Sequence, residues 1–514
     1  MKPQETGVKV QMTGIAKRFG ETVALEAVDF AARRGEIHGL LGENGAGKTT
    51  LMNILSGLYR ADRGEIRIDG VPAPIASPID ALRRGIGMVH QHVELIPNFT
   101  ALENVLLGRE GSRWWLRVQP QRAKVEEVAR RFGLAVDLDV EVRRLAAGVQ
   151  QKIEILKALY RGVDVLVLDE PTTMLTPQEV DTLFATVRTM AEQGLTVVFI
   201  THKIREILRN CDRVTVMRGG RRVATSERAD VDEGRLVELM IGERLAPTVR
   251  EDRLGAAGPP VLEVRDLTMP AARGRMPLAG GTISVGCGEV VGVAGVAGNG
   301  QRELADALVG LLRPERGSIV LAGRDVTRAS VRERLAAGLV YVPEDRIHDG
   351  LLPGLSVAEN FMLGLHPFAF AGRITFDHGQ ARRLARQAIE EYAIRARDED
   401  ARAIELSGGN IQKLLVARAM TQARLAGGRL LLAMNPTRGL DVRATEFVRG
   451  RCLDFARAGG GVLLVSEDLD ELCQLCDRIA VMFRGAAVAD LPRERFDPYA
   501  IGRLMAGVTA AGAA

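Results

Sequence analysis

The sequence predicts an α/β protein with two similar domains in tandem, each built on a parallel sheet. Apolar runs of strand length, such as residues 163–168 and 196–200, alternate with helix-like segments. A glycine-rich loop of the phosphate-binding type joins one such strand to a helix, and the sequence landmarks of the first half return in the second half. A largely helical stretch at 95–160 predicts a helical subdomain inserted between strands of the first domain.

The glycine-rich loop follows the apolar run at 37–41 and fits the pattern G-x-x-x-x-G-K-[ST] at every required position. Its glycines let successive backbone N–H groups turn inward around a phosphate, and the N-terminus of the following helix adds a partial positive charge. Lys48 supplies a full charge, and Thr49 offers a hydroxyl to Mg2+. A glycine turn without a ligand would not require these two residues, so the loop predicts nucleotide binding. The residues expected around the phosphates are Gly42, Glu43, Asn44, Gly45, Ala46, Gly47, Lys48, Thr49 and Thr50.

Composition is typical of a globular protein, with 46% hydrophobic and 26% charged residues in a chain of 514. The net charge of +4 comes from 69 basic and 65 acidic residues, which is too weak a bias to indicate nucleic-acid binding. The apolar runs fall short of the roughly 18 residues that span a bilayer, and the N-terminus has no apolar core of a signal peptide. We therefore expect a cytoplasmic protein, and five cysteines fit reduced thiols in that compartment.

The internal repeat sets the expected domain limits. Gly42 returns as Gly295, and the triplet Cys-Asp-Arg at 211–213 returns at 476–478. The separation grows along the chain while the order stays the same, which indicates small insertions in the second copy. We expect a first domain at 1–247, a charged and Gly/Pro-rich linker at 248–260, a second domain at 261–508 and a frayed tail at 509–514.

Further motifs follow the phosphate loop of the first copy. Gln91 lies in the segment 88–91, residues 145–151 come before a predicted strand, and the pair Asp169-Glu170 ends that strand. His202 follows the strand after it. This series resembles the ATP-binding cassette (ABC) proteins, and the resemblance covers essentially the whole chain, twice. It implies two tandem P-loop ABC ATPase domains, each with a RecA-like parallel-sheet core and a helical subdomain, and it implies ATP and Mg2+ as cofactors.

The resemblance also implies a role for each side chain. Asp169 is expected in the Mg2+ shell, and Gln91 is expected to touch the metal and the attacking water. Glu170 is expected to be the general base that polarises this water. His202 is expected to contact the γ-phosphate, and Phe19 is expected to stack on adenine.

The second copy lacks most of these groups. The replacements are Gln301 for the lysine, Arg302 for the hydroxyl residue, Glu344 for the glutamine, Met434 and Asn435 for the Asp-Glu pair, and Glu467 for the histidine. Without a metal carboxylate and a base, the charge of the transition state would be largely unstabilised there.

The signature motif shows the opposite asymmetry. It is intact in the second copy at Ser407, Gly408, Gly409 and Asn410, whereas residues 146–148 of the first copy read Ala-Ala-Gly and lack the serine hydroxyl. In the ABC family two cassettes enclose ATP head to tail, and each site takes its phosphate loop from one copy and its signature from the other. The resemblance therefore implies that the two cassettes of this chain form the ATP sandwich, with one hydrolytic site and one inert site.

Within the ABC proteins, the chain is similar to the ATPases of bacterial simple-sugar and nucleoside importers. The segments that carry this similarity lie in the second copy at 342–346, 406–413, 435–441 and 465–471. Residues 88–92 and 154–162 look more like the nucleoside branch than the ribose or galactose branch. A cassette does not touch the cargo, so the cargo follows from analogy alone.

This similarity implies an ATP-hydrolysing subunit that binds two integral-membrane permeases and is fed by an extracytoplasmic substrate-binding protein. We expect a peripheral protein at the cytoplasmic face of the cell (inner) membrane, without a nucleic-acid partner. Trp114 and Trp115 either dock on a permease or pack internally. The alternatives are a simple-sugar importer, a regulator without a transport role, and a soluble tandem cassette protein that acts on ribosomes or DNA. The short linker and the lack of a basic block argue against the last class.

Overall fold

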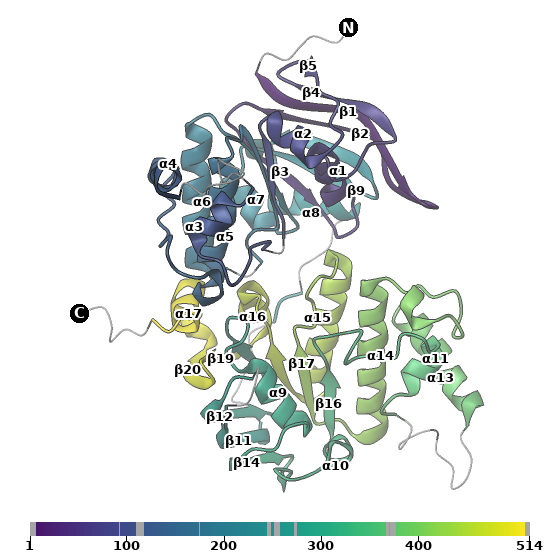
Figure 1. Ribbon diagram of the computed structural model, residues 1–514. Helices are drawn as coiled ribbons and strands as arrows, with labels where there is room; N and C mark the ends of the chain where they lie inside the picture. Colours follow the sequence, from purple (N-terminus) through teal and green to yellow (C-terminus); the bar gives the residue numbers. More distant parts are fainter. Residues whose placement is uncertain are drawn as a thin grey trace. The chain divides into compact units, whose positions relative to one another are not determined.

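The computed structural model describes residues 7–91, 93–108, 118–173, 175–243, 248–250, 258–271, 275–365, 370 and 377–508 (Figure 1). The chain divides into two compact units, Met1–Leu245 and Ala246–Ala514. Trp114, Trp115, most of the expected linker and the tail lie outside the described residues. Among the helices that the structure describes, none is long and apolar enough to cross a membrane.

Unit 1 contains a four-stranded antiparallel sheet, a six-stranded sheet and a group of helices. Its elements are β1 (Val8–Phe19), β2 (Thr22–Arg33), β3 (Ile37–Gly42), α1 (Lys48–Leu55), β4 (Arg63–Ile68), β5 (Val71–Pro72), α2 (Pro78–Arg83), β6 (Ile86–Val89), α3 (Ala101–Leu106), α4 (Val118–Arg131), η1 (Val142–Arg144), α5 (Ala147–Tyr160), β7 (Val165–Asp169), α6 (Pro177–Glu192), β8 (Thr196–Thr201), α7 (Ile204–Asn210), β9 (Arg213–Arg218), β10 (Arg221–Glu227), η2 (Arg228–Asp230) and α8 (Glu233–Ile241).

The six-stranded sheet of unit 1 has the order β10-β9-β3-β8-β7-β6, and every pair is parallel except β10 with β9. All residues of β3, β7 and β8 are buried, as expected for a parallel sheet with both faces covered. The other sheet has the order β2-β1-β4-β5. Leu51 and Met52 of α1 share a core cluster with Met12 of β1 and Val198 of β8, so α1 packs between the two sheets. Helices α3, α4 and α5 form the helical subdomain (Figure 1).

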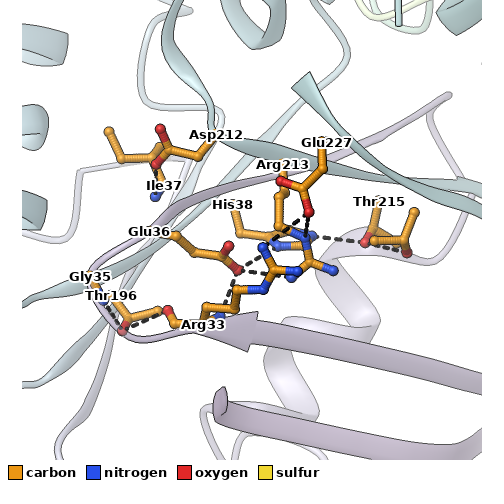
Figure 2. A network of polar contacts seen from close by, with 11 residues as sticks. Arg33, Gly35, Glu36, Ile37, His38, Thr196, Asp212, Arg213, Thr215 and Glu227 are labelled. Atoms are coloured by element: carbon orange, nitrogen blue, oxygen red, sulfur yellow. Dashed lines mark hydrogen bonds and ion pairs between the residues drawn. The ribbon is translucent and has the colours of Figure 1, made fainter. Parts of the chain in front are cut away.

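A buried polar network holds the start of β3 (Figure 2). The Glu36 carboxylate accepts hydrogen bonds from the backbone N–H of Arg33 (2.6 Å) and from Nδ1 of His38 (2.9 Å), and it pairs with Arg213 (3.4 Å). The other ring nitrogen of His38 lies 2.8 Å from the hydroxyl of Thr215 in β9. Burial lowers the pKa of His38, which favours a neutral ring at pH 7. The network therefore fixes β3 at the end opposite the phosphate loop without a buried imidazolium.

Unit 2 has the same sheet topology. Its elements are β11 (Pro260–Met269), β12 (Leu278–Gly286), β13 (Val290–Ala294), α9 (Gln301–Val309), β14 (Arg316–Leu321), β15 (Arg324–Asp325), α10 (Val331–Ala336), β16 (Leu339–Val342), α11 (Val357–Met362), α13 (His378–Glu391), η3 (Ala403–Glu405), α14 (Gly408–Ala426), β17 (Leu430–Met434), α15 (Val442–Arg457), β18 (Gly461–Val465), α16 (Leu469–Leu475), β19 (Arg478–Phe483), β20 (Ala486–Pro492), η4 (Arg493–Arg495) and α17 (Pro498–Met505). The sheets have the orders β12-β11-β14-β15 and β16-β17-β18-β13-β19-β20. Read from β20, the second order matches that of unit 1 strand for strand.

The described part of the connection after unit 1 is bonded to unit 2. Arg250 donates two hydrogen bonds to the carboxylate of Asp477 (3.0 and 2.9 Å) and one to the carbonyl of Gly288 (2.8 Å). The hydroxyl of Thr248 bonds the carbonyl of Glu446 (3.4 Å). The expected linker thus begins with residues that are anchored on unit 2, and the domain limits taken from the sequence stay a prediction.

Arg250 forms an ion pair in unit 2 that an arginine of helix α6 forms in unit 1. In unit 1 the equivalent aspartate, Asp212, pairs with Arg188 of α6 (2.8 Å). Helices α6 and α15 both have 16 residues, and Leu453 stands in α15 where Arg188 stands in α6. Leu453 is fully buried and cannot pair with Asp477, so the guanidinium comes from the connecting segment instead.

We predict that Arg250→Met lowers the free energy of unfolding of unit 2 by about 2–3 kcal/mol, because it leaves the carboxylate of Asp477 largely buried without its partner. The side chains of this pair are 9% and 17% exposed. The matched control is Arg188→Met, whose pair is 40% and 39% exposed and should cost about 1 kcal/mol or less. Urea unfolding followed by hydrogen exchange in β19 and β9 measures both effects. Equal losses in the two variants would contradict the prediction.

Candidate functional site

The candidate site of unit 1 lies at the carboxyl ends of β3, β8, β7 and β6, which are neighbours in the sheet. The phosphate loop follows β3, His202 follows β8, Asp169 ends β7, and Gln91 comes two residues after β6. The register places Leu41 opposite Thr201 and Asp169 opposite Ile200, so these strands end at similar levels. The sheet therefore brings together four motifs that are far apart in the sequence.

The phosphate loop depends on its glycines. Gly45 and Gly47 have φ of 80° and 96°, in the left-handed region that other residues rarely adopt. A Cβ at Gly47 would also lie 2.7 Å from Leu25, and one at Gly42 would lie 2.4 Å from the carbonyl of Met217. Helix α1 begins at Lys48, and its N-cap residue is Gly47, which offers no side chain. The amides of the first turn can therefore face an anion.

Lys48 and Asp169 are charged groups in buried surroundings. The ammonium of Lys48 donates to the carbonyls of Gly42 (2.6 Å) and Glu43 (3.0 Å), across the mouth of the loop. Burial lowers the pKa of Lys48, against the charges of Glu170, Asp169 and Glu43. Burial likewise raises the pKa of Asp169, while the hydrogen bond from Thr49 opposes this shift. Both groups would gain from a ligand that brings the opposite charge.

A carboxylate and a hydroxyl that meet in this way fit a Mg2+ site. Mg2+ is usually bound by one or two carboxylates together with the phosphates of the substrate. The described residues hold no group of three His, Cys, Asp or Glu side chains that would make an all-protein metal cage. Asp169 and Thr49 could therefore hold Mg2+ in the presence of a bound nucleotide. The side-chain oxygen of Gln91, whose amide nitrogen donates to Glu170, is the third candidate ligand.

Glu170 joins Gln91 and His202 into one hydrogen-bonded triad. One carboxylate oxygen accepts from the amide of Gln91 (3.0 Å), and the other lies 2.7 Å from Nδ1 of His202. Burial raises the pKa of Glu170, but the hydrogen bond and charge of His202, with the charges of Lys48 and Lys203, outweigh it and hold the pKa below its ordinary value. The carboxylate is therefore ionised at pH 7, as a general base must be.

Unit 2 arranges different side chains on the same framework. Asn435 takes the place of Glu170 and donates its amide to Glu344 (3.0 Å), which stands at the position of Gln91. Glu467 stands at the position of His202, and its backbone N–H donates to the side chain of Asn435 (3.0 Å). Unit 2 thus has three side chains at the positions of the triad, but the central one is the amide of Asn435 and the outer two are the carboxylates of Glu344 and Glu467.

The intact signature forms the N-terminus of α14. Ser407 is the N-cap, and its hydroxyl accepts hydrogen bonds from the backbone (3.4 Å) and the side chain (2.9 Å) of Asn410. Gly408, which is exposed, and Gly409, which is half-buried, begin the first turn. In unit 1 the equivalent helix α5 begins after Ala146, which offers no hydroxyl. Of the helices α5 and α14, only α14 begins with a serine cap followed by two glycines.

Phe19 ends β1 and is 44% exposed. The ring of Tyr59, which follows α1, packs edge-on against it with centroids 5.2 Å apart. The ammonium of Lys17 lies 5.5 Å from the centre of the Phe19 ring. Lys17 lies two residues before Phe19 in the same strand. No sequence pattern points to Tyr59, because its contact with Phe19 depends on how β1 packs against the segment after α1.

Glu206 is a further residue of this region that none of the sequence motifs includes. Its carboxylate accepts hydrogen bonds from the hydroxyl of Thr172 after β7 (2.7 Å) and from that of Thr201 at the end of β8 (3.0 Å). Glu471 of unit 2 is fully buried and makes the equivalent contacts. This glutamate could have been found in the sequence, because it recurs at the separation that relates the Cys-Asp-Arg triplets.

The chain is similar to known proteins over nearly its whole length. A family model described as ABC transporter matches residues 25–173 and 278–431. A glucose import ATP-binding protein of Haloferax volcanii is 42% identical over 97% of this chain and 96% of the relative. A nucleoside import ATP-binding protein of Lactococcus lactis and a guanosine import ATP-binding protein of Bacillus subtilis are each 40% identical, over 97% of this chain and 98% of the relative.

The two family matches fall on the two units that share one sheet topology, and the relatives cover both units. The predicted fold of two ABC ATPase cassettes is confirmed. The chain therefore belongs to the ABC transporter family and is one of its ATP-binding proteins, an ATPase with two cassettes in one polypeptide.

Proposed function

We propose that this chain hydrolyses ATP at one site, in unit 1, to drive the import of a nucleoside through partner permeases. The observation that carries the hydrolytic site is the Gln91–Glu170–His202 triad beside Lys48 and Asp169. The names of the Lactococcus lactis and Bacillus subtilis relatives support a nucleoside cargo. The name of the Haloferax volcanii relative supports a simple sugar as the second candidate.

The reaction follows from the arrangement of charge. The backbone of the phosphate loop and Lys48 would bind the phosphates, and the exposed ring of Phe19 would stack on adenine. Thr49, Asp169 and Gln91 would hold Mg2+, which neutralises charge on the phosphates when bound.

Glu170 would accept the proton of the attacking water, and His202 would keep this carboxylate ionised and contact the γ-phosphate. The N-terminus of α14, with Ser407, Gly408, Gly409 and Asn410, would complete the site in the family's ATP sandwich. Catalysis of this kind relies on positioning and electrostatic stabilisation.

The word import in the names of the relatives supports the remaining parts of the proposal. The chain would bind two integral-membrane permeases and lie as a peripheral protein at the cytoplasmic face of the cell membrane. An extracytoplasmic substrate-binding protein would deliver the cargo to the permeases.

We predict that Glu170→Gln lowers the ATPase rate at least about 100-fold, because the amide cannot accept the proton of the attacking water. The affinity for ATP should change little, since the phosphate loop and Lys48 are untouched. A phosphate-release assay with a parallel binding titration measures both quantities. The matched control is Glu467→Gln in unit 2, which should keep the rate within about twofold of the parent. Near-normal activity of Glu170→Gln would refute the assignment of the base.

We also predict a shift of the pH profile in His202→Ala. Removal of the histidine takes away the main interaction that lowers the pKa of Glu170, while burial still raises it, so the pKa should rise. Because the base must be deprotonated, the acid limb of the residual single-turnover rate should move to higher pH than in the parent chain. Rates between pH 4.5 and 7.5 test this shift, and a lower rate with an unchanged acid limb would contradict it.

The cargo is tested in proteoliposomes that hold this chain, its permeases and its substrate-binding protein. We expect nucleosides to stimulate ATP hydrolysis and uptake, and we expect ribose, galactose and glucose to leave both at the basal level. Stimulation by a sugar alone would correct the cargo and keep the importer. Stimulation by none of these compounds would refute the import proposal.

A further inference from the structure

The phosphate loop of unit 2 keeps the backbone of an anion site. Gly298 and Gly300 have φ of 86° and 103°, close to the values of Gly45 and Gly47 in unit 1. Helix α9 follows with nine residues, and its N-cap residue is again a glycine without a side chain. The backbone shape alone would therefore accept a phosphate, and occupancy depends on the side chains around it.

The loop of unit 2 has lost its ammonium. Gln301 is buried at the position of Lys48, and its amide donates to the carbonyl of Val296 in the same loop (3.2 Å). It thus retains an internal contact of the loop but carries no charge. Arg302 stands where Thr49 offers its hydroxyl, and it pairs with Asp349 (3.3 Å). The side chain of Arg302 is 66% exposed, so it does not replace the buried ammonium that Lys48 places on the carbonyls of its loop.

The metal carboxylate of unit 2 is missing as well. Met434 ends β17 at the position of Asp169, and it is 2% exposed in a cluster of apolar side chains. A thioether is not a ligand that Mg2+ prefers. The charge of a triphosphate would meet neither a lysine nor a held metal ion at these two positions.

Two carboxylates occupy the end of the site where unit 1 has its triad. Arg438 bridges them, with its guanidinium 2.8 Å from Glu344 and 3.8 Å from Glu467. Burial raises the pKa of Glu467, while the charge of Arg438 opposes this shift. The guanidinium is already shared by two acids, so an entering γ-phosphate would have to compete with both of them.

The adenine platform of unit 1 has no aromatic counterpart among the described residues of unit 2. The strand register places Ala271 at the position of Phe19, and the hydrogen bonds after α9 place Leu312 at the position of Tyr59. Methyl and isobutyl groups cannot stack on a purine as an aromatic pair can. The base therefore loses its platform, in addition to the loss of charge at the phosphates.

We propose that unit 2 is closed to Mg2+–ATP and that the chain binds a single nucleotide, at unit 1. In unit 2, the side chains at the equivalent positions form hydrogen bonds and ion pairs with groups of the protein itself. Unit 2 therefore stays folded without nucleotide, and its role is to present the signature at the N-terminus of α14. The binding of ATP at unit 1 rests on the proposed function, whereas the closure of unit 2 does not. We expect the affinity of unit 2 for Mg2+–ATP to be at least about 100-fold below that of unit 1.

The test counts nucleotides on the full chain. Isothermal titration of the Glu170→Gln chain with ATP and Mg2+, in which hydrolysis is stopped, should give one site per chain. Adding Lys48→Ala should abolish that site and leave none. Two sites per chain, or one site that survives Lys48→Ala, would overturn the proposal. Absence of any binding in Glu170→Gln would refute the proposed function of unit 1 and would still agree with a closed unit 2, so the two failures are distinguishable.

A second variant tests the cause. Gln301→Lys, Arg302→Thr and Met434→Asp together restore the ammonium, the hydroxyl and the metal carboxylate to unit 2. In the background of Lys48→Ala and Glu170→Gln, this chain should gain one Mg2+–ATP site that EDTA abolishes. Circular dichroism verifies that the variant folds, and a folded variant without any gain would contradict the physical explanation. The count on the Glu170→Gln chain decides the proposal if the variant does not fold.

Discussion

The candidate site depends on one constraint, the adjacency of β3, β8, β7 and β6 in a parallel sheet. Parallel strands in register end at one edge, and each additional strand between two motifs would separate them by a further spacing of about 4.8 Å. Because β7 lies directly beside β8, Glu170 and His202 can approach to 2.7 Å. The buried network at the start of β3 fixes the other end of the strand that carries the phosphate loop. The chemistry of the site thus rests on apolar strands that take no part in it.

The comparison of the two units separates what the backbone supplies from what the side chains supply. Glu170 and Asn435 both have a positive φ, 45° and 41°, which is unfavourable for residues other than glycine. Each donates its backbone N–H to the neighbouring strand, Glu170 to Ile200 (3.0 Å) and Asn435 to Val465 (2.7 Å). The strained conformation therefore persists in unit 2 without a general base. It belongs to the turn after the strand, and the proposed catalytic role of Glu170 rests on its carboxylate alone.

Much of the fold and part of the site could be predicted from the sequence, because these features are local. The strand, loop and helix around Lys48 are continuous in sequence, and the repeat is visible as an ordered series of landmarks. The missed features depend on tertiary packing. Tyr59 reaches Phe19 only because β1 packs beside the segment after α1, and Arg250 replaces an arginine that α15 lacks. No periodicity or motif encodes such contacts, since each partner lies far away in the sequence.

The two sites also differ in how their own charges are satisfied. In unit 1, burial disfavours the ionised forms of both Lys48 and Asp169, and the protein compensates them only in part. A bound triphosphate with Mg2+ would supply the missing opposite charges, so relief of this desolvation would contribute part of the binding free energy. In unit 2 the positions of these two residues are neutral, and the acids at the far end share Arg438. A ligand would therefore relieve nothing there, and it would have to break contacts that the protein already makes.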